Sequence, residues 1–396
     1  RSGPRDERAV RRFEAAEAIA FALPRQEPLR YAALATRLAR IALESGDPAL
    51  VAKGMAFEAW TAQLMGTTAA KLSEFAERTR TLVERDGDAR ARFWFALNVG
   101  NAELQRNPGA ALVHFERARE ILTTDPHPSI SFLMPIVAWS VLIVQCLQGS
   151  FRASARDVPA LLDDVWAGDD RGVAPFLAGG PGAIARVAVG DVVSLRSDLE
   201  RARNAWKKDY FTWQDIMLTQ GALALELHAG ALERAREHVA ELESKLARSL
   251  ARHAGPVRAY VEYLGAWVSL SRASKLEPGS ERTRLLDAAS ASLGFFRSIS
   301  AVSAIWSAPL EPAVEILRGR PEHAVRLLRE VAADRDVAER LPFYNVYARR
   351  ALGGLLHGDE GAALVRDADA FLRDRGVVEP EHFVATTAPG LAPARG

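Results

Sequence analysis

The residues with the strongest chemical character lie in one short segment, Asn204 to Leu218, which reads NAWKKDYFTWQDIML. Aromatic rings interleaved with lysines can stack on a peptide or a small ligand, and Trp and Tyr are frequent at the energetic centres of interfaces. Six residues are therefore candidate binding residues: Trp206, Lys207, Lys208, Tyr210, Phe211 and Trp213. In the alternative interpretation, which carries more weight, Trp206 and Phe211 fill space between two helices and the lysines are only solvent-exposed.

The sequence motifs of common catalytic centres are missing. The chain contains no G-x-x-x-x-G-K-[ST] phosphate loop, no H-E-x-x-H metal motif and no G-x-S-x-G nucleophile elbow. The eight histidines are dispersed, and His228 and His238, ten residues apart, lack an acidic third ligand at metal spacing. We therefore expect surface or helix-end histidines, no metal site, no cofactor and no catalytic residue, so that this chain is not itself an enzyme.

Two further features have a structural explanation. Gly179, Gly180 and Gly182 are spaced like a phosphate-binding turn, but no strand precedes them and no Lys and Ser or Thr follow them. A kinked or broken helix between Ala167 and Gly190 is the better prediction. Cys146 is the only cysteine, which excludes an internal disulfide and a zinc site built on cysteines. Because it lies in an apolar helical stretch, we expect a small core residue.

Composition and charge narrow the class of protein. Of the 396 residues, 51 are basic and 50 acidic, so the net charge of +1 gives no electrostatic reason to expect nucleic acid or an anionic membrane as partner. The apolar stretch Ile130 to Leu147 is interrupted by Pro135, Ser140 and Gln145, which favours a buried helix over a membrane span. The first residues contain no signal peptide, and we expect a cytoplasmic segment of a longer protein.

The candidate residues must be positioned by helices. Apolar residues recur at i, i+3, i+4 and i+7 nearly throughout the chain, whereas alternating β-branched residues are scarce, and this predicts an all-α fold. After Gly230, for example, one apolar stripe is formed by Leu232, Ala235, Val239, Leu242 and Leu246.

Glycine or asparagine residues recur between these helical patterns. The markers are Gly66, Asn107, Gly149, Gly190, Gly230, Gly279, Gly319 and Gly358, and successive markers are 39 to 49 residues apart. We expect each to end a helix in the left-handed conformation just before an amphipathic helix begins.

Such a spacing accommodates two helices and their turns, and periods of 20–50 residues are typical of solenoids. The sequence therefore predicts an α-solenoid of TPR-like helix-turn-helix repeats with a period of about 40 residues over residues 28–375. Residues 1–27 would form a linker or connecting helix, and residues 376–396 a C-terminal cap and frayed tail. The repeats are TPR-like because the consensus TPR signature, with its period of about 34 residues, is not legible.

Three segments resemble a known family. LRYAALATRLARIALESGDPALVAKGMAFEAW (Leu29 to Trp60), NAWKKDYFTWQDIMLTQGALALELHAG (Asn204 to Gly230) and LLHGDEGAALVRDADAFLRDRGVVEPEHFVATTAPG (Leu355 to Gly390) occur in this order. They are similar to parts of the helical region that follows the kinase domain in large bacterial, especially myxobacterial, Ser/Thr protein kinases. The resemblance covers residues 28–391.

The resemblance implies a regulatory or interaction region whose kinase domain precedes residue 1. Its partner would be a protein or peptide bound on the concave face. No catalytic residue is carried over, because the Gly-rich, His-Arg-Asp and Asp-Phe-Gly motifs of kinases are absent from this chain. A similar helical array also follows nucleotide-binding domains in bacterial transcription regulators. The alternative function is therefore a ligand-sensing array of a signal-transducing ATPase or transcription regulator.

Overall fold

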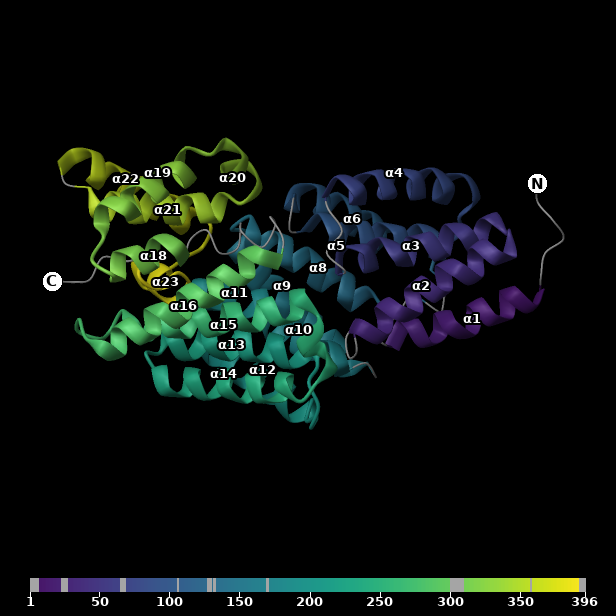
Figure 1. Ribbon diagram of the computed structural model, residues 1–396, viewed down its shortest axis with the longest axis horizontal. Helices are drawn as coiled ribbons and strands as arrows, with labels where there is room; N and C mark the ends of the chain where they lie inside the picture. Colours follow the sequence, from purple (N-terminus) through teal and green to yellow (C-terminus); the bar gives the residue numbers. More distant parts are fainter. Residues whose placement is uncertain are drawn as a thin grey trace. The chain divides into compact units, whose positions relative to one another are not determined.

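All regular secondary structure in the part of the chain that the structure, a computed structural model, describes is helical (Figure 1). The described residues are 7–22, 28–64, 69–104, 107–126, 130, 133–168, 171–299, 310–356 and 358–391. Within them there are 21 α-helices, two short 3-10 helices and no β-strand, so the predicted all-α class is confirmed. Helices that follow one another in the sequence pack together in neighbouring pairs.

The described residues group into two compact units, whereas the sequence predicts one array over 28–375. Unit 1 comprises Arg1–Val144, Tyr210–Trp213 and Arg248–Val257, and unit 2 comprises Gln145–Asp209, Gln214–Ala247 and Arg258–Gly396. Two short segments of the second half of the chain thus belong to the first unit by their contacts.

Unit 1 is built from paired amphipathic helices. They are α1 (Glu7–Ala22), α2 (Pro28–Ser45), α3 (Pro48–Leu64), α4 (Ala69–Asp86), α5 (Ala89–Leu104), α6 (Pro108–Thr124), the larger part of α8 (Met134–Leu147), and the 3-10 helix η2 (Leu250–His253). The rings of Phe57 and Trp94 lie 4.8 Å apart in its core. Phe13 of α1 is fully buried there, so the segment expected as a linker or connecting helix contributes to a core.

The apolar stretch around Cys146 forms α8, and its side chains Val137 and Val144 belong to the core of unit 1. Among the described residues, no helix combines the length and the hydrophobicity that a bilayer crossing requires. The predicted buried helix is thus present between Met134 and Leu147.

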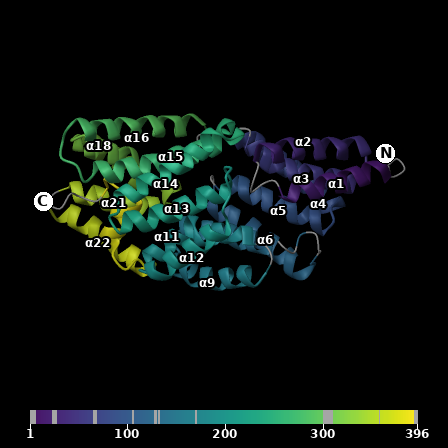
Figure 2. The same cartoon turned by 90° about the horizontal axis from the view of Figure 1, so that it is seen from below.

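Unit 2 contains the remaining helices, and Figures 1 and 2 show α12 to α15 lying alongside one another. They are α9 (Phe151–Ala167), η1 (Arg171–Val173), α10 (Ala174–Ala178), α11 (Gly180–Ala188), α12 (Val192–Ala205), α13 (Trp213–His228), α14 (Leu232–Ala247), α15 (Gly255–Ala273), α16 (Ser280–Ile299), α18 (Leu310–Leu317), α19 (Pro321–Ala333), α20 (Arg335–Arg340), α21 (Pro342–Leu355), α22 (Gly358–Asp374) and α23 (Pro380–Thr387). The stripe predicted after Gly230 is confirmed at Ala235, Val239, Leu242 and Leu246, which are buried.

Several helices are followed by a glycine in the left-handed conformation. Gly149, Gly190, Gly230 and Gly319 have φ angles of 76°, 80°, 72° and 72°, and Gly358 has a φ of 83°. At the first four, the amide of the next residue donates to the carbonyl five residues earlier, as Ala231 does to Glu226 at 2.8 Å. This is the Schellman arrangement, in which glycine is favoured because it lacks the Cβ that clashes at positive φ. The left-handed conformation predicted at these glycines is confirmed.

At two other markers the prediction of a left-handed cap is wrong. Asn107 has a φ of −148° and its side chain accepts a hydrogen bond from the amide of Ala110, so it caps the beginning of α6. A side-chain oxygen that satisfies the first free amides of the next helix favours this extended conformation. Gly279 is not among the described residues with positive φ and lies directly before α16. Gly66 falls outside the described residues.

The glycine-rich segment forms the predicted broken helix. α10 ends at Ala178 and α11 begins at Gly180. A Cβ added at Gly179 would lie 2.2 Å from the carbonyl oxygen of Met217, and one added at Gly221 would lie 2.9 Å from the Cα of Gly179. The glycines therefore let the backbones of this break and of α13 approach closely.

Residues 377–391 pack within unit 2 through α23, whose Phe383 and Val384 are buried. Residues 392–396, where fraying is expected, lie outside the described residues.

Candidate functional site

The predicted aromatic and basic segment begins in the non-helical connection between α12 and α13. Trp206 is the C-cap of α12 and is half-buried, whereas Lys207 and Lys208 are exposed. The Nζ atom of Lys208 lies 5.2 Å from the centroid of the Trp206 ring, which is within the range of a cation–π interaction. These two side chains therefore lie close together on unit 2.

The other three candidates belong to unit 1 by their contacts, so the predicted cluster is divided between the two units. Tyr210 is 50% exposed and Phe211 only 3% exposed, while Trp213 is half-buried at the beginning of α13. The alternative interpretation, a ring that fills space in the interior, agrees with the burial of Phe211. For Trp206, Lys207, Lys208, Tyr210 and Trp213 a binding role stays a prediction.

A second group of aromatic residues was missed from the sequence. Four of the six tyrosines lie in unit 2 as two Y-x-x-Y pairs, Tyr260 and Tyr263 on α15 and Tyr344 and Tyr347 on α21. We call these four residues the tyrosine cluster. The repeated Y-x-x-Y spacing, which places both rings on one helical face, is the sequence signal that could have found it.

The tyrosine cluster packs against other aromatic rings. The ring centroids of Tyr260 and Tyr263 are 6.3 Å apart, and that of Tyr263 lies 5.9 Å from Phe296 of α16. The Tyr347 ring lies 4.1 Å from Phe343. Aromatic contacts at these distances fix ring positions and add about 0.5–1.5 kcal/mol each beyond the area they bury.

The hydroxyls of the tyrosine cluster are held in the neutral form. Burial raises the pKa of Tyr260, whose hydroxyl donates to Oε1 of Gln220 at 2.9 Å. Burial and the neighbouring tyrosines raise the pKa of Tyr344 well above its ordinary value. Burial also raises the pKa of Tyr263 to about 12, although this side chain keeps part of its surface accessible. Tyr263 thus offers a neutral hydroxyl that can both donate and accept a hydrogen bond.

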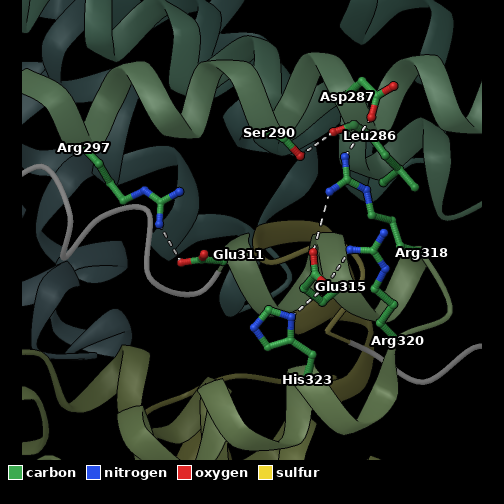
Figure 3. A network of polar contacts seen from close by, with 9 residues as sticks. All are labelled: Leu286, Asp287, Ser290, Arg297, Glu311, Glu315, Arg318, Arg320 and His323. Atoms are coloured by element: carbon green, nitrogen blue, oxygen red, sulfur yellow. Dashed lines mark hydrogen bonds and ion pairs between the residues drawn. The ribbon is translucent and has the colours of Figure 1, made fainter.

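A buried carboxylate organises a third group, drawn in Figure 3. Glu315 of α18 accepts from Nδ1 of His323 at 3.0 Å and lies 3.5 Å from Arg320 and 3.6 Å from Arg318. Arg318 also pairs with Asp287 of α16 at 2.7 Å. A carboxylate that orients an imidazole is one part of a general-base site.

This network lacks a positioned nucleophile among the residues in Figure 3. Figure 3 includes one serine, Ser290, and its hydroxyl donates to the carbonyl of Leu286 at 2.8 Å. The contacts join α16, α18 and α19, and they give the buried Glu315 side chain cationic partners. We therefore interpret the network as a connection between helices.

The remaining candidates from the sequence have distinct positions. Burial raises the pKa of Cys146 to about 12, and its Sγ donates to the carbonyl of Pro181 at 3.2 Å, as expected of a core residue. His228 is the last residue of α13, as expected of a helix-end histidine. Its ring contacts that of His382 in α23, which is far from it in the sequence. Over the described ranges, no group of three His, Cys, Asp or Glu residues could hold a metal ion.

A scan against protein-family models gives no match to this chain, and a search of curated proteins gives none either.

Proposed function

We propose that this chain is a non-catalytic interaction module, an α-solenoid of TPR-like hairpins that binds a protein or peptide on its concave face. Support comes from the recurrence of one helix-ending arrangement at Gly149, Gly190 and Gly230, which are 41 and 40 residues apart. A supersecondary unit repeated at such a period is typical of proteins that present extended binding surfaces.

The observation that carries the proposal is the convergence of four tyrosines from two separate hairpins. Tyrosine offers a large rigid contact area with a polar tip and loses little conformational entropy on binding. The partly accessible side chain of Tyr263 and its aromatic surroundings suit recognition of a peptide segment. The Trp206 and Lys208 pair provides a second contact of the same aromatic and polar kind.

We further propose that the module is the C-terminal sensor or docking region of a cytoplasmic bacterial Ser/Thr protein kinase. The support is the ordered resemblance of three segments, which together extend from Leu29 to Gly390. In this arrangement, occupation of the binding face would alter the activity or the substrate choice of the attached kinase domain.

The test uses the full-length parent protein and a partner identified by cross-linking in the native cell. We expect Tyr263→Phe and Lys208→Glu each to weaken that partner at least tenfold, measured by isothermal titration calorimetry. Lys275→Glu changes an equally exposed lysine on another connection of unit 2 and serves as the matched control. Unchanged affinity in both test variants, together with unchanged kinase activity after removal of residues 28–375, contradicts the proposal.

A ligand-sensing array of a signal-transducing ATPase or transcription regulator is the second candidate. It is favoured by the enclosure of the Tyr263 hydroxyl among tyrosines, which suits a small polar ligand. A Walker A motif upstream of Arg1 would select this function, and kinase motifs at the same place would select the first.

A further inference from the structure

The segment that follows Gly376 contacts many parts of unit 2. We call residues 377–391 the C-terminal segment. The amide of Val378 donates to the carbonyl of Ala188, the last residue of α11, at 2.9 Å. Nε1 of Trp267 on α15 donates to the carbonyl of Thr386 at 2.7 Å, and the hydroxyls of Tyr347 and Thr387 are hydrogen-bonded.

Apolar contacts hold the same segment. The ring centroid of Phe383 lies 5.2 Å from that of Phe151 on α9 and 6.1 Å from that of Phe343 on α21. A Cβ added at Gly390 would lie 3.0 Å from Leu317 of α18. The C-terminal segment therefore joins helices that lie far apart in the sequence of unit 2.

Two histidines face each other where the C-terminal segment meets the end of α13. The ring centroids of His228 and His382 are 4.3 Å apart, with an interplanar angle of 64°. Nε2 of His382 lies 2.9 Å from the carbonyl oxygen of His228. Because a carbonyl only accepts, His382 must carry a proton on Nε2, and its contact holds the segment to α13.

The surroundings of His228 oppose its protonation. Its Nδ1 atom is buried without a hydrogen-bond partner, so a proton there would be left unsatisfied. Burial lowers the pKa of His228 first, and the neighbouring His382 lowers it further, whereas Glu379 acts in the opposite direction. A proton on Nδ1 of His228 is therefore disfavoured while the C-terminal segment packs against the end of α13.

We propose that residues 377–391 form a latch on unit 2 that is released when His228 is protonated. The open latch accepts a proton on His228 more readily than the closed latch does, so acid shifts the equilibrium toward the open form. The stability of the closed latch is fully present above the ordinary histidine pKa, near 6.5, and is lost as the pH falls below it. Release uncovers the side chains of Trp267 and Tyr347 and the surface of unit 2 against which Phe383 packs.

The test is hydrogen–deuterium exchange of the full chain at pH 7.5 and pH 5.5, corrected for intrinsic exchange rates. Because one proton is taken up on opening, we expect the opening constant of residues 380–387 to rise as the pH falls below the ordinary histidine pKa, near 6.5, by up to about tenfold per pH unit, and to level off below the lowered pKa of His228. Exchange in peptides from the middle of α13 shows whether unit 2 unfolds as a whole, and exchange in peptides from α5 shows the same for unit 1.

Two variants separate titration from packing. His228→Phe keeps an aromatic ring against His382 without a titrating group, and His382→Gln keeps an N–H donor toward the carbonyl of His228 without a charge. His228→Phe should abolish the pH response of residues 380–387, and His382→Gln should weaken it, because burial still lowers the pKa of His228 in that variant. His253→Phe, at an exposed position in unit 1, should keep the full response. A wild-type segment with the same opening constant at both pH values overturns the latch. A full response that persists in both His228→Phe and His382→Gln also overturns it.

Discussion

Tyr260 and Tyr263 are one turn apart on α15, and their hydroxyls have different surroundings. That of Tyr260 donates to Gln220, a residue that is only 5% exposed. Tyr263 contacts three rings, and its hydroxyl has no hydrogen-bond partner among the described residues. A buried acceptor that loses its donor costs its full desolvation penalty, whereas removal of an unpaired hydroxyl costs little. The two hydroxyls are therefore expected to serve stability and binding, respectively.

The matched substitutions Tyr260→Phe and Tyr263→Phe test this division. We expect Tyr260→Phe to lower the free energy of unfolding by about 2 kcal/mol, because Oε1 of Gln220 remains buried without a donor. Tyr263→Phe should change it by less than about 0.5 kcal/mol. Urea unfolding followed by circular dichroism measures both values. Equal losses in the two variants would show that the Tyr263 hydroxyl has a structural partner of its own.

At the scale of one element, the break between α10 and α11 shows why glycines recur in this segment. Gly180 has a φ of 51°, and Gly179 brings its backbone against Met217 of α13. Gly294 of α16, in contrast, has open space around its missing Cβ and a helical φ. The same residue type therefore has a packing role at one position and none at the other.

Alanine substitutions at these positions should have opposite signs. Gly179→Ala places a Cβ 2.2 Å from the carbonyl oxygen of Met217, and we expect a loss of about 3 kcal/mol in the stability of unit 2, since backbone cannot move away cheaply. Gly294→Ala should stabilise by about 0.5–1 kcal/mol, because alanine costs less conformational entropy in a helix. Thermal unfolding by differential scanning calorimetry gives both shifts. A neutral Gly179→Ala would mean that α10 and α13 pack less tightly than described.

Elements were predictable from the sequence where one local rule decided them. The period of apolar residues predicted the helices, and the glycines at 149, 190, 230 and 319 predicted helix ends, because the left-handed cap depends on a few neighbouring residues. Asn107 was misassigned because the same residue type also begins helices, and only the position of its side-chain oxygen distinguishes the two roles.

At the scale of the whole molecule, the contacts that define the sites join residues far apart in the sequence. His228 meets His382, Trp267 meets Thr386, and Tyr260 meets Gln220. Periodicity reports which face of a helix is buried and carries no information on which distant face covers it. The tyrosine cluster and the histidine pair were therefore not predicted, although the Y-x-x-Y spacing was visible.

The C-terminal segment also connects the last helices of unit 2 to the first. Phe383 packs on Phe151 of α9, and the amide of Arg152 donates to the carbonyl of Arg375 at 3.2 Å. In an open solenoid, stability is a sum over repeats and their nearest neighbours, so a substitution at one end destabilises that end alone. The contacts of unit 2 instead couple its first and last hairpins directly.

Phe383→Ala distinguishes these two cases. Removal of a fully enclosed phenylalanine costs about 3–5 kcal/mol, and the direct contact with Phe151 should transmit this loss to α9 as well as to α21. Native-state hydrogen exchange measures the loss separately for α9, α14 and α21. Val378→Ala, at a position that is 62% exposed in the same segment, is the matched control and should leave all three unchanged. Reduced protection in α21 with full protection in α9 would mean that unit 2 behaves as an open array, in which each hairpin depends only on its neighbours in the sequence.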